Sequence, residues 1–226
     1  EASHFDDAIM QAISDAACDE RTSAIGEIGL DYHYDFSPRD VQKVVFAEQI
    51  RLACDLGLPA VLHIREAFDD AWEILEKVGY PSAGCVLHCY TSDAAEVARW
   101  VDAGCYIAFG GALTFKSSDD IRAAARKVPL DRLLTETDSP YMAPVPFRGQ
   151  NCEPAHTVWS AMALFALLSS DDPMDVSDRA LSNRYFVYSS DEEADMRRFF
   201  TQTYENALRI LDREPLAFQS KRSVDA

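Results

Sequence analysis

The strongest constraint on the fold is an alternation of short apolar runs with amphipathic helical patterns. Between the runs, apolar residues recur at three- and four-residue spacing, which predicts helices, and we expect Asp93 and Asp119 to cap two of them. Such alternation predicts β–α units around a parallel sheet, either closed into a barrel or open and doubly wound. The predicted strands, nearly continuous in apolar character as buried parallel strands are, are residues 23–28, 59–64, 84–89, 105–109 and 132–137.

Outside these units the chain is expected to belong to the same domain, 1–226. Segment 169–192 is polar and turn-rich, which predicts a surface insertion, and the tail after residue 212 is expected to be flexible. Further helices are predicted over residues 5–17, 157–168 and 193–211.

The composition limits the classes of function. Hydrophobic residues make up 48% of the chain, which excludes a disordered protein, and no apolar stretch approaches the ~20 residues that span a bilayer. The net charge is −17, which opposes the wrapping of a nucleic-acid duplex by counterion release alone. The six cysteines match neither a zinc knuckle nor a disulfide framework. We therefore expect a reducing compartment, the cytoplasm, with the nucleus as the alternative.

Side chains that bind metals lie at or near the ends of the apolar runs. These are Glu27, His63, His88, Glu136 and Asp138, and in β/α proteins the carboxyl ends of the strands carry the active site. Two imidazoles with two carboxylates suit Zn²⁺, Mn²⁺ or Mg²⁺. Taken singly, each residue also has a structural explanation, as a hydrogen-bonded core histidine or as a carboxylate that accepts turn donors. Together they predict a divalent metal site.

Six longer motifs are more specific: AIGEIGLDY (24–32), LHIRE (62–66), LHCY (87–90), LTETDSP (134–140), PFRGQNCEP (146–154) and NALRIL (206–211). In their order and spacing they resemble the signature of the TatD-type metal-dependent deoxyribonucleases. The resemblance implies an α/β fold, a TIM-type (β/α) barrel. Only about five of the eight barrel strands are recognisable, so we expect a barrel that is incomplete at the N-terminus.

The resemblance also implies a centre of one or two divalent ions (Mg, Mn or Zn). By position, Glu27 would bridge the metals, and His63 and His88 would hold one of them. Asp138 would hold the other and act as the base toward water, so that Glu27 and Asp138 are the expected catalytic carboxylates.

The substrate implied by the resemblance is DNA. Arg65, Arg148 and Asn151 would face its phosphates, because guanidinium groups bind phosphate oxygens in a bidentate manner. The expected activity is hydrolysis of phosphodiester bonds, as a 3′-to-5′ exonuclease on the ends of single strands, with RNA as the alternative nucleic acid.

Two departures keep other hypotheses open. The family's first strand carries a His-x-His pair that this chain lacks, and the five apolar runs correspond to the last five strands of the barrel. The chain would then be a fragment, be completed by something else, or be catalytically inactive. A further alternative is a metal-dependent hydrolase of amides, esters or lactones, because the same water-activating centre serves carbonyl substrates.

Overall fold

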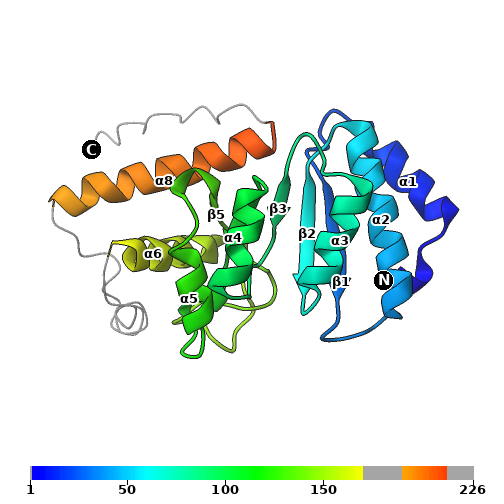
Figure 1. Cartoon of the computed structure of the whole chain (residues 1–226). Coiled ribbons are helices and arrows are strands. Elements are labelled where there is room, and N and C mark those ends of the chain that lie inside the picture. The colour runs from blue at the N-terminus through cyan, green and yellow to red at the C-terminus, as the bar shows by residue number, and fades with distance from the viewer. Residues whose placement is uncertain (1, 170–189, 213–226) are drawn as a thin grey trace, which may run out of the picture.

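One five-stranded sheet organises the molecule, and all neighbouring strands in it are parallel. The computed structural model describes residues 2–169 and 190–212. The strands follow one another in chain order across the sheet, as the strands of a β/α barrel do (Figure 1). They are β1 (Ile25–Asp31), β2 (Ala60–Arg65), β3 (Cys85–Leu87), β4 (Tyr106–Phe109) and β5 (Leu133–Thr135).

Helices connect successive strands and cover one face of the sheet (Figure 1). The α-helices are α1 (Asp7–Ala17), α2 (Arg39–Leu56), α3 (Phe68–Val78), α4 (Ala94–Asp102), α5 (Asp119–Ala125), α6 (Thr157–Leu168) and α8 (Ser190–Ile210). Short 3₁₀ helices are η1 (Ala2–His4), η2 (Gly111–Thr114), η3 (Leu130–Arg132) and η4 (Pro154–His156). Among the described residues, none of these helices has the length and apolar character needed to cross a membrane.

The two faces of the sheet bury different sets of side chains, because successive residues of a strand point to opposite sides. We call the side that packs on helices α2–α5 the helix face and the other the inner face. Along β2, Leu62 and Ile64 belong to the large core on the helix face, whereas Val61 lies with a smaller apolar cluster on the inner face. That smaller cluster is Val86, Tyr106, Ala108, Leu134 and Ile210.

Helix α8 is tied to the last strand by a buried amide. The side chain of Asn206 is fully buried and donates to the carbonyl oxygens of Leu130 and Leu133 at 2.8 and 2.9 Å. Ile210, at the end of α8, reaches the inner-face cluster. Helix α8 therefore supports β5 and the loop that follows it.

All five predicted strands and the predicted helices are present, with shifted ends. β1 runs three residues past the predicted end at residue 28, to Asp31. Asp93 caps α4, with its carboxylate accepting from Ala95 and Glu96. Asp119 does not cap α5, since it is the first helical residue and its carboxylate accepts from buried Arg122.

At the end of the predicted surface insertion, 169–192, residues 190–192 are exposed and form the first turn of α8, so the predicted helix over 193–211 begins three residues earlier. Residues 170–189 of that insertion and the predicted flexible tail, 213–226, lie outside the described residues.

Candidate metal centre

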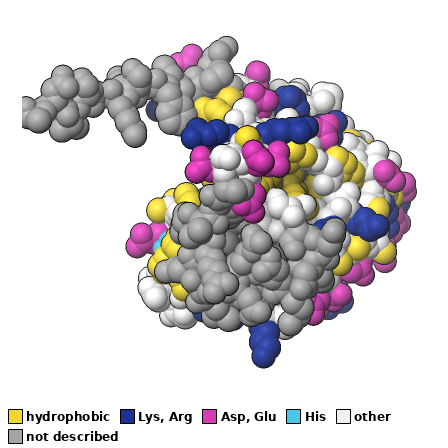
Figure 2. Space-filling model, turned by 90° about the vertical axis from the view of Figure 1, so that its left-hand side faces the viewer, with side chains coloured by type: hydrophobic (Ala, Val, Ile, Leu, Met, Phe, Trp, Pro, Cys, Tyr) yellow, Lys and Arg dark blue, Asp and Glu magenta, His cyan; other side chains and the backbone are white. Residues whose placement is uncertain are grey.

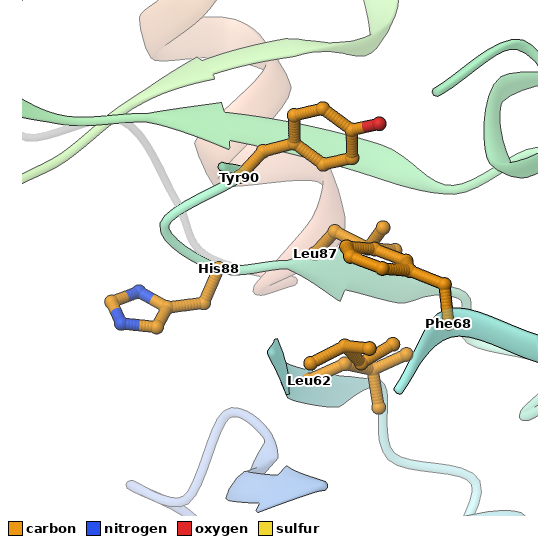
Figure 3. Close-up of a pocket in the computed structure, with 6 residues that line it drawn as sticks. Leu62, Phe68, Leu87, His88 and Tyr90 are labelled. Atoms are coloured by element: carbon orange, nitrogen blue, oxygen red, sulfur yellow. The ribbon is translucent and has the colours of Figure 1, made fainter. Parts of the chain in front are cut away.

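The imidazole of His88 lies at the middle of the candidate centre. His88 directly follows β3, and its ring points away from Leu62, Phe68 and Leu87, which pack on the helix face (Figure 3). Its Nδ1 lies 2.6 Å from Oε2 of Glu136. Both ring nitrogens of His88 thus meet carboxylates, since Nε2 lies 3.1 Å from Oε1 of Glu27.

Glu27 joins the two histidines. Its Oε1 lies 3.1 Å from Nδ1 of His63, the same distance as from Nε2 of His88. A bulge in β1, between Ile25 and Ile28, accompanies this placement. Glu27 therefore lies within β1, on the inner face, because the strand continues past the predicted end at residue 28 to Asp31.

Close approach of β1 and β2 depends on Gly29, which pairs with His63 in the sheet. Its φ of +155° lies in a region that side chains disfavour, and an added β-carbon would lie 1.7 Å from the carbonyl oxygen of His63. Only glycine fits at this point, so the Gly-Glu-Ile-Gly segment positions Glu27 against His63.

Asp138 completes the cluster from the loop after β5. Its Oδ1 lies 3.5 Å from Nε2 of His88, and its side chain is about one-third exposed. Its carbonyl oxygen accepts from the backbone N–H of Tyr141 at 2.6 Å, which closes a turn that holds the carboxylate. The structure therefore brings Glu27, His63, His88 and Asp138 together from four different parts of the sheet.

The carboxylates strongly perturb the histidines. Burial lowers the pKa of His88, but Asp138, Glu136 and Glu27 outweigh it and raise this pKa to about 10. The hydrogen bond to Glu27 raises the pKa of His63, and the same contact lowers the pKa of Glu27. A divalent cation would replace protons that these imidazoles share with the carboxylates, so the donor set fits a metal ion.

A second grouping of possible ligand atoms shares His88. Ligand atoms of His88, Cys89 and Glu136 lie within 4.8 Å of one another. Burial raises the pKa of the Cys89 thiol well above its usual range, and the thiol contacts the sulfur of Met142 at 3.6 Å. A thiol that keeps its proton is a poor ligand. The set around Glu27 is therefore the better candidate.

Comparison with known proteins places the chain in a family. The family model described as TatD related DNase matches residues 1–189. The chain belongs to the TatD family. It is 41% identical over 149 residues to the uncharacterized metal-dependent hydrolase YabD of Bacillus subtilis, covering 66% of this chain and 58% of that protein. It is 44% identical over 139 residues to the uncharacterized metal-dependent hydrolase YcfH of Escherichia coli K12, covering 62% of this chain and 52% of that protein.

Solved structures of the TatD family share the fold. The TatD homologue YjjV from Escherichia coli K12 matches with a TM-score of 0.67 and 28% identity, covering 81% of this chain and 71% of that one. A TatD family hydrolase from Entamoeba histolytica matches with a TM-score of 0.67 and 21% identity, covering 90% and 67%. The predicted family and the predicted TIM-type barrel are confirmed. The chain spans little more than half the length of the two curated relatives, 58% and 52%.

The three predicted substrate-binding residues of this TatD-family chain are spread out. Arg65 ends β2 on the inner face, and its guanidinium lies 4.8 Å from the centre of the Tyr34 ring. Arg148 is exposed in the loop before α6 and stacks on the Phe115 ring at 3.6 Å, and Asn151 is exposed in the same loop. Among the contacts of the described residues, neither Arg148 nor Asn151 touches the four clustered side chains.

Two further residues touch the cluster: Glu136, which the sequence marked as a side chain at a strand end but not as a ligand of the centre, and Asp31, which was given no role. Oε2 of Glu136 is hydrogen-bonded to Nδ1 of His88. Oδ2 of Asp31 lies 3.1 Å from Nε2 of His63. The alternation of side chains along a strand could have indicated both residues. Asp31 is an even number of residues from Glu27, and Glu136 is an even number from Asp138, so each pair is expected on one face. Burial raises the pKa of Asp31, but hydrogen bonds from Tyr34 and His63 outweigh it, so the net shift is downward.

Proposed function

We propose that this protein is a metal-dependent hydrolase that cleaves phosphodiester bonds of DNA from the 3′ ends of single strands. The observation that carries the proposal is the position of Glu27, with Oε1 3.1 Å from a nitrogen of both His63 and His88. The family description as a DNase and the names of the relatives as metal-dependent hydrolases support the reaction class.

Glu27, His63, His88 and Asp138 would hold one or two divalent ions (Mg, Mn or Zn), which polarise a phosphoryl oxygen and acidify water when bound. The ligand atoms of this set are oxygen and imidazole nitrogen. Carboxylate oxygens suit Mg²⁺ and Mn²⁺, whereas imidazole nitrogens favour Zn²⁺.

Asp138 is the proposed proton acceptor. Its carboxylate is about one-third exposed, so water can approach it, and the turn to Tyr141 fixes its position. A carboxylate held in this way takes the proton from the attacking water as the bond to phosphorus forms.

Glu136 is proposed to orient His88. Its Oε2 accepts from Nδ1 at 2.6 Å, which fixes the tautomer and turns the lone pair of Nε2 toward Glu27 and Asp138. This arrangement keeps the donor atom of His88 aimed at the site between the carboxylates.

Arg65 is the proposed contact for a substrate phosphate near the cluster, because it lies on the inner face two residues beyond His63. Arg148 and Asn151 stay proposals for phosphates further along the strand. The net charge of −17 opposes broad electrostatic binding of a duplex, and acidic and basic side chains are both scattered over the face in Figure 2. A short single-stranded end held in the site is compatible with this charge.

The proposed location is the cytoplasm, with the nucleus as the alternative. All six cysteines are free thiols, and Cys85, Cys105 and Cys152 are buried. Free thiols persist in reducing compartments.

The experiment is degradation of single-stranded DNA labelled at the 3′ or the 5′ end, with Mg²⁺, Mn²⁺ or Zn²⁺ added in turn. The wild type is compared with Asp138→Asn, and single-stranded RNA and a chromogenic carboxylic ester are run in parallel. We expect metal-dependent shortening with early loss of the 3′ label, and loss of at least about 100-fold in rate for Asp138→Asn.

Each contrary result has a distinct meaning. Early loss of the 5′ label would overturn the polarity, and faster cleavage of RNA would overturn the substrate. Hydrolysis of the ester without cleavage of DNA would favour the carbonyl-substrate alternative. No hydrolysis with any metal would contradict the proposal for this chain.

A further inference from the structure

The loop after β1 exposes two aromatic rings beside the candidate metal centre. The side chains of Tyr34 and Phe36 are 55% and 70% exposed. Their rings are parallel to within 1°, with centres 5.2 Å apart. Adjoining exposed apolar side chains mark binding sites, whereas single exposed apolar residues are normal on protein surfaces. A flat, open ring face suits a flat, apolar ligand.

The loop that carries these rings is held in place. Oδ1 of Asp31 accepts from the backbone N–H groups of His33 and Tyr34, both at 2.9 Å. The buried side chain of Gln42 donates to the carbonyl oxygens of Ser37 at 2.8 Å and of Asp31 at 3.1 Å. Both ends of the segment are thus fixed, so a ligand that stacks on the rings meets a preformed surface.

A cationic group lies against the same rings. The guanidinium of Arg65 lies 4.8 Å from the centre of the Tyr34 ring, a distance at which cation–π attraction operates. Aromatic rings beside an arginine are the elements with which proteins bind single-stranded nucleic acid, because rings stack on bases and guanidinium groups bind phosphates.

The rings are connected to the candidate centre through one carboxylate. Oδ1 of Asp31 holds the loop, while its Oδ2 lies 3.1 Å from Nε2 of His63. The loop that carries the rings is therefore tied through Asp31 to His63, one of the residues of the candidate metal centre.

We infer that Tyr34 and Phe36 form a stacking platform that receives a nucleobase of the single-stranded end whose phosphodiester lies at the Glu27 cluster. This inference rests on the proposed function and adds to it a base-recognition element. Because every base has a π-face, the platform would be tolerant of sequence and would distinguish strands with bases from strands without them.

The test compares binding of two fluorescent oligonucleotides of equal length, oligothymidylate and an abasic strand, by anisotropy in EDTA and by cleavage with Mn²⁺. The variants are Tyr34→Ala, Phe36→Ala and the double variant, with Tyr34→Phe as the conservative change. The matched control is Tyr204→Ala, which removes a 37% exposed ring from α8, across the molecule from β1 (Figure 1).

We expect the alanine variants to bind and cleave oligothymidylate about 5- to 150-fold less well, as loss of one stacked base does. The abasic strand should be unaffected, and Tyr34→Phe and Tyr204→Ala should match the wild type. Circular dichroism confirms that each variant is folded.

Two outcomes overturn the inference in different ways. If the wild type cleaves both strands equally and the variants change nothing, the platform is wrong while the proposed function stands. If the wild type neither binds nor cleaves either strand, the proposed function fails and the platform fails with it.

Discussion

Replacing Glu136 with alanine tests whether the candidate centre depends on a carboxylate behind His88. Glu136 and His88 are 16% and 15% exposed, and their contact is 2.6 Å long, at the short end of charge-assisted hydrogen bonds. Loss of a carboxylate that orients a metal-ligating histidine costs about 10- to 100-fold in metal affinity, or about 1.4–2.8 kcal/mol. Because solvent screens this buried contact little, we expect a loss in the upper half of that range.

The assay is calorimetric titration of metal-free protein with Zn²⁺ and with Mn²⁺. Glu136→Gln keeps an acceptor for Nδ1 but loses the charge, so its loss should be smaller than that of the alanine variant. Glu73→Gln is the control, because Glu73 is 60% exposed and pairs with Lys77 on the surface of α3. An affinity of Glu136→Ala equal to that of the wild type, in a variant that is folded by circular dichroism, would refute the assigned role.

Three further predictions follow from the site and its supports. The double variant His63→Ala/His88→Ala should lose bound metal in elemental analysis, and an unchanged metal content would show that the ligand assignment is wrong. Gly29→Ala should lower the free energy of unfolding by about 2–4 kcal/mol in urea, since its β-carbon meets a backbone oxygen at 1.7 Å. The control Gly57→Ala, with φ of +65° and no atom within 4 Å of the added β-carbon, should cost only about 1 kcal/mol. In EDTA the melting temperature should fall as pH rises from 6.5 through about 10, because the raised pKa of His88 stabilises the fold fully below 6.5 and is lost above its folded value. A His88→Ala variant with the same pH dependence would contradict that assignment.

The strands were predictable because buried parallel strands have to be apolar on both sides, and the runs in this chain are short and separated. The position at which β1 ends was not predictable from this pattern. The apolar run stops at Ile28, and Gly29 next to it usually signals a break. Here the glycine instead allows close contact with the carbonyl of His63, and β1 continues to Asp31.

The two predicted helix caps show how a buried partner decides between equal sequence signals. Asp93 caps α4 as expected. Asp119 is also an aspartate at the expected start of a helix, but α5 begins one residue earlier than expected. Its carboxylate therefore does not cap the helix and instead accepts a hydrogen bond from buried Arg122 at 2.6 Å. No local pattern reveals that Arg122 is buried.

The candidate site was predictable as a set of strand ends and not as a set of contacts. Parallel strands bring their carboxyl ends to one edge, which explains why His63, His88 and Asp138 come close to Glu27. The partner of Nδ1 of His88 lies 48 residues away in the chain. Side-chain torsions and loop paths decide such contacts, as they do for Arg148, which stacks on Phe115.

The amide of Asn206 gives the order of synthesis a consequence for the candidate metal centre. It joins α8 to Leu133, 73 residues earlier in the chain, and β5 leads directly to Glu136 and Asp138. While α8 is still inside the ribosome, the carbonyls of Leu130 and Leu133 have no Asn206 to accept from, and the inner-face cluster has no Ile210. A nascent chain therefore lacks these supports of the Asp138 loop until α8 has emerged, and the candidate metal centre cannot gain them before then.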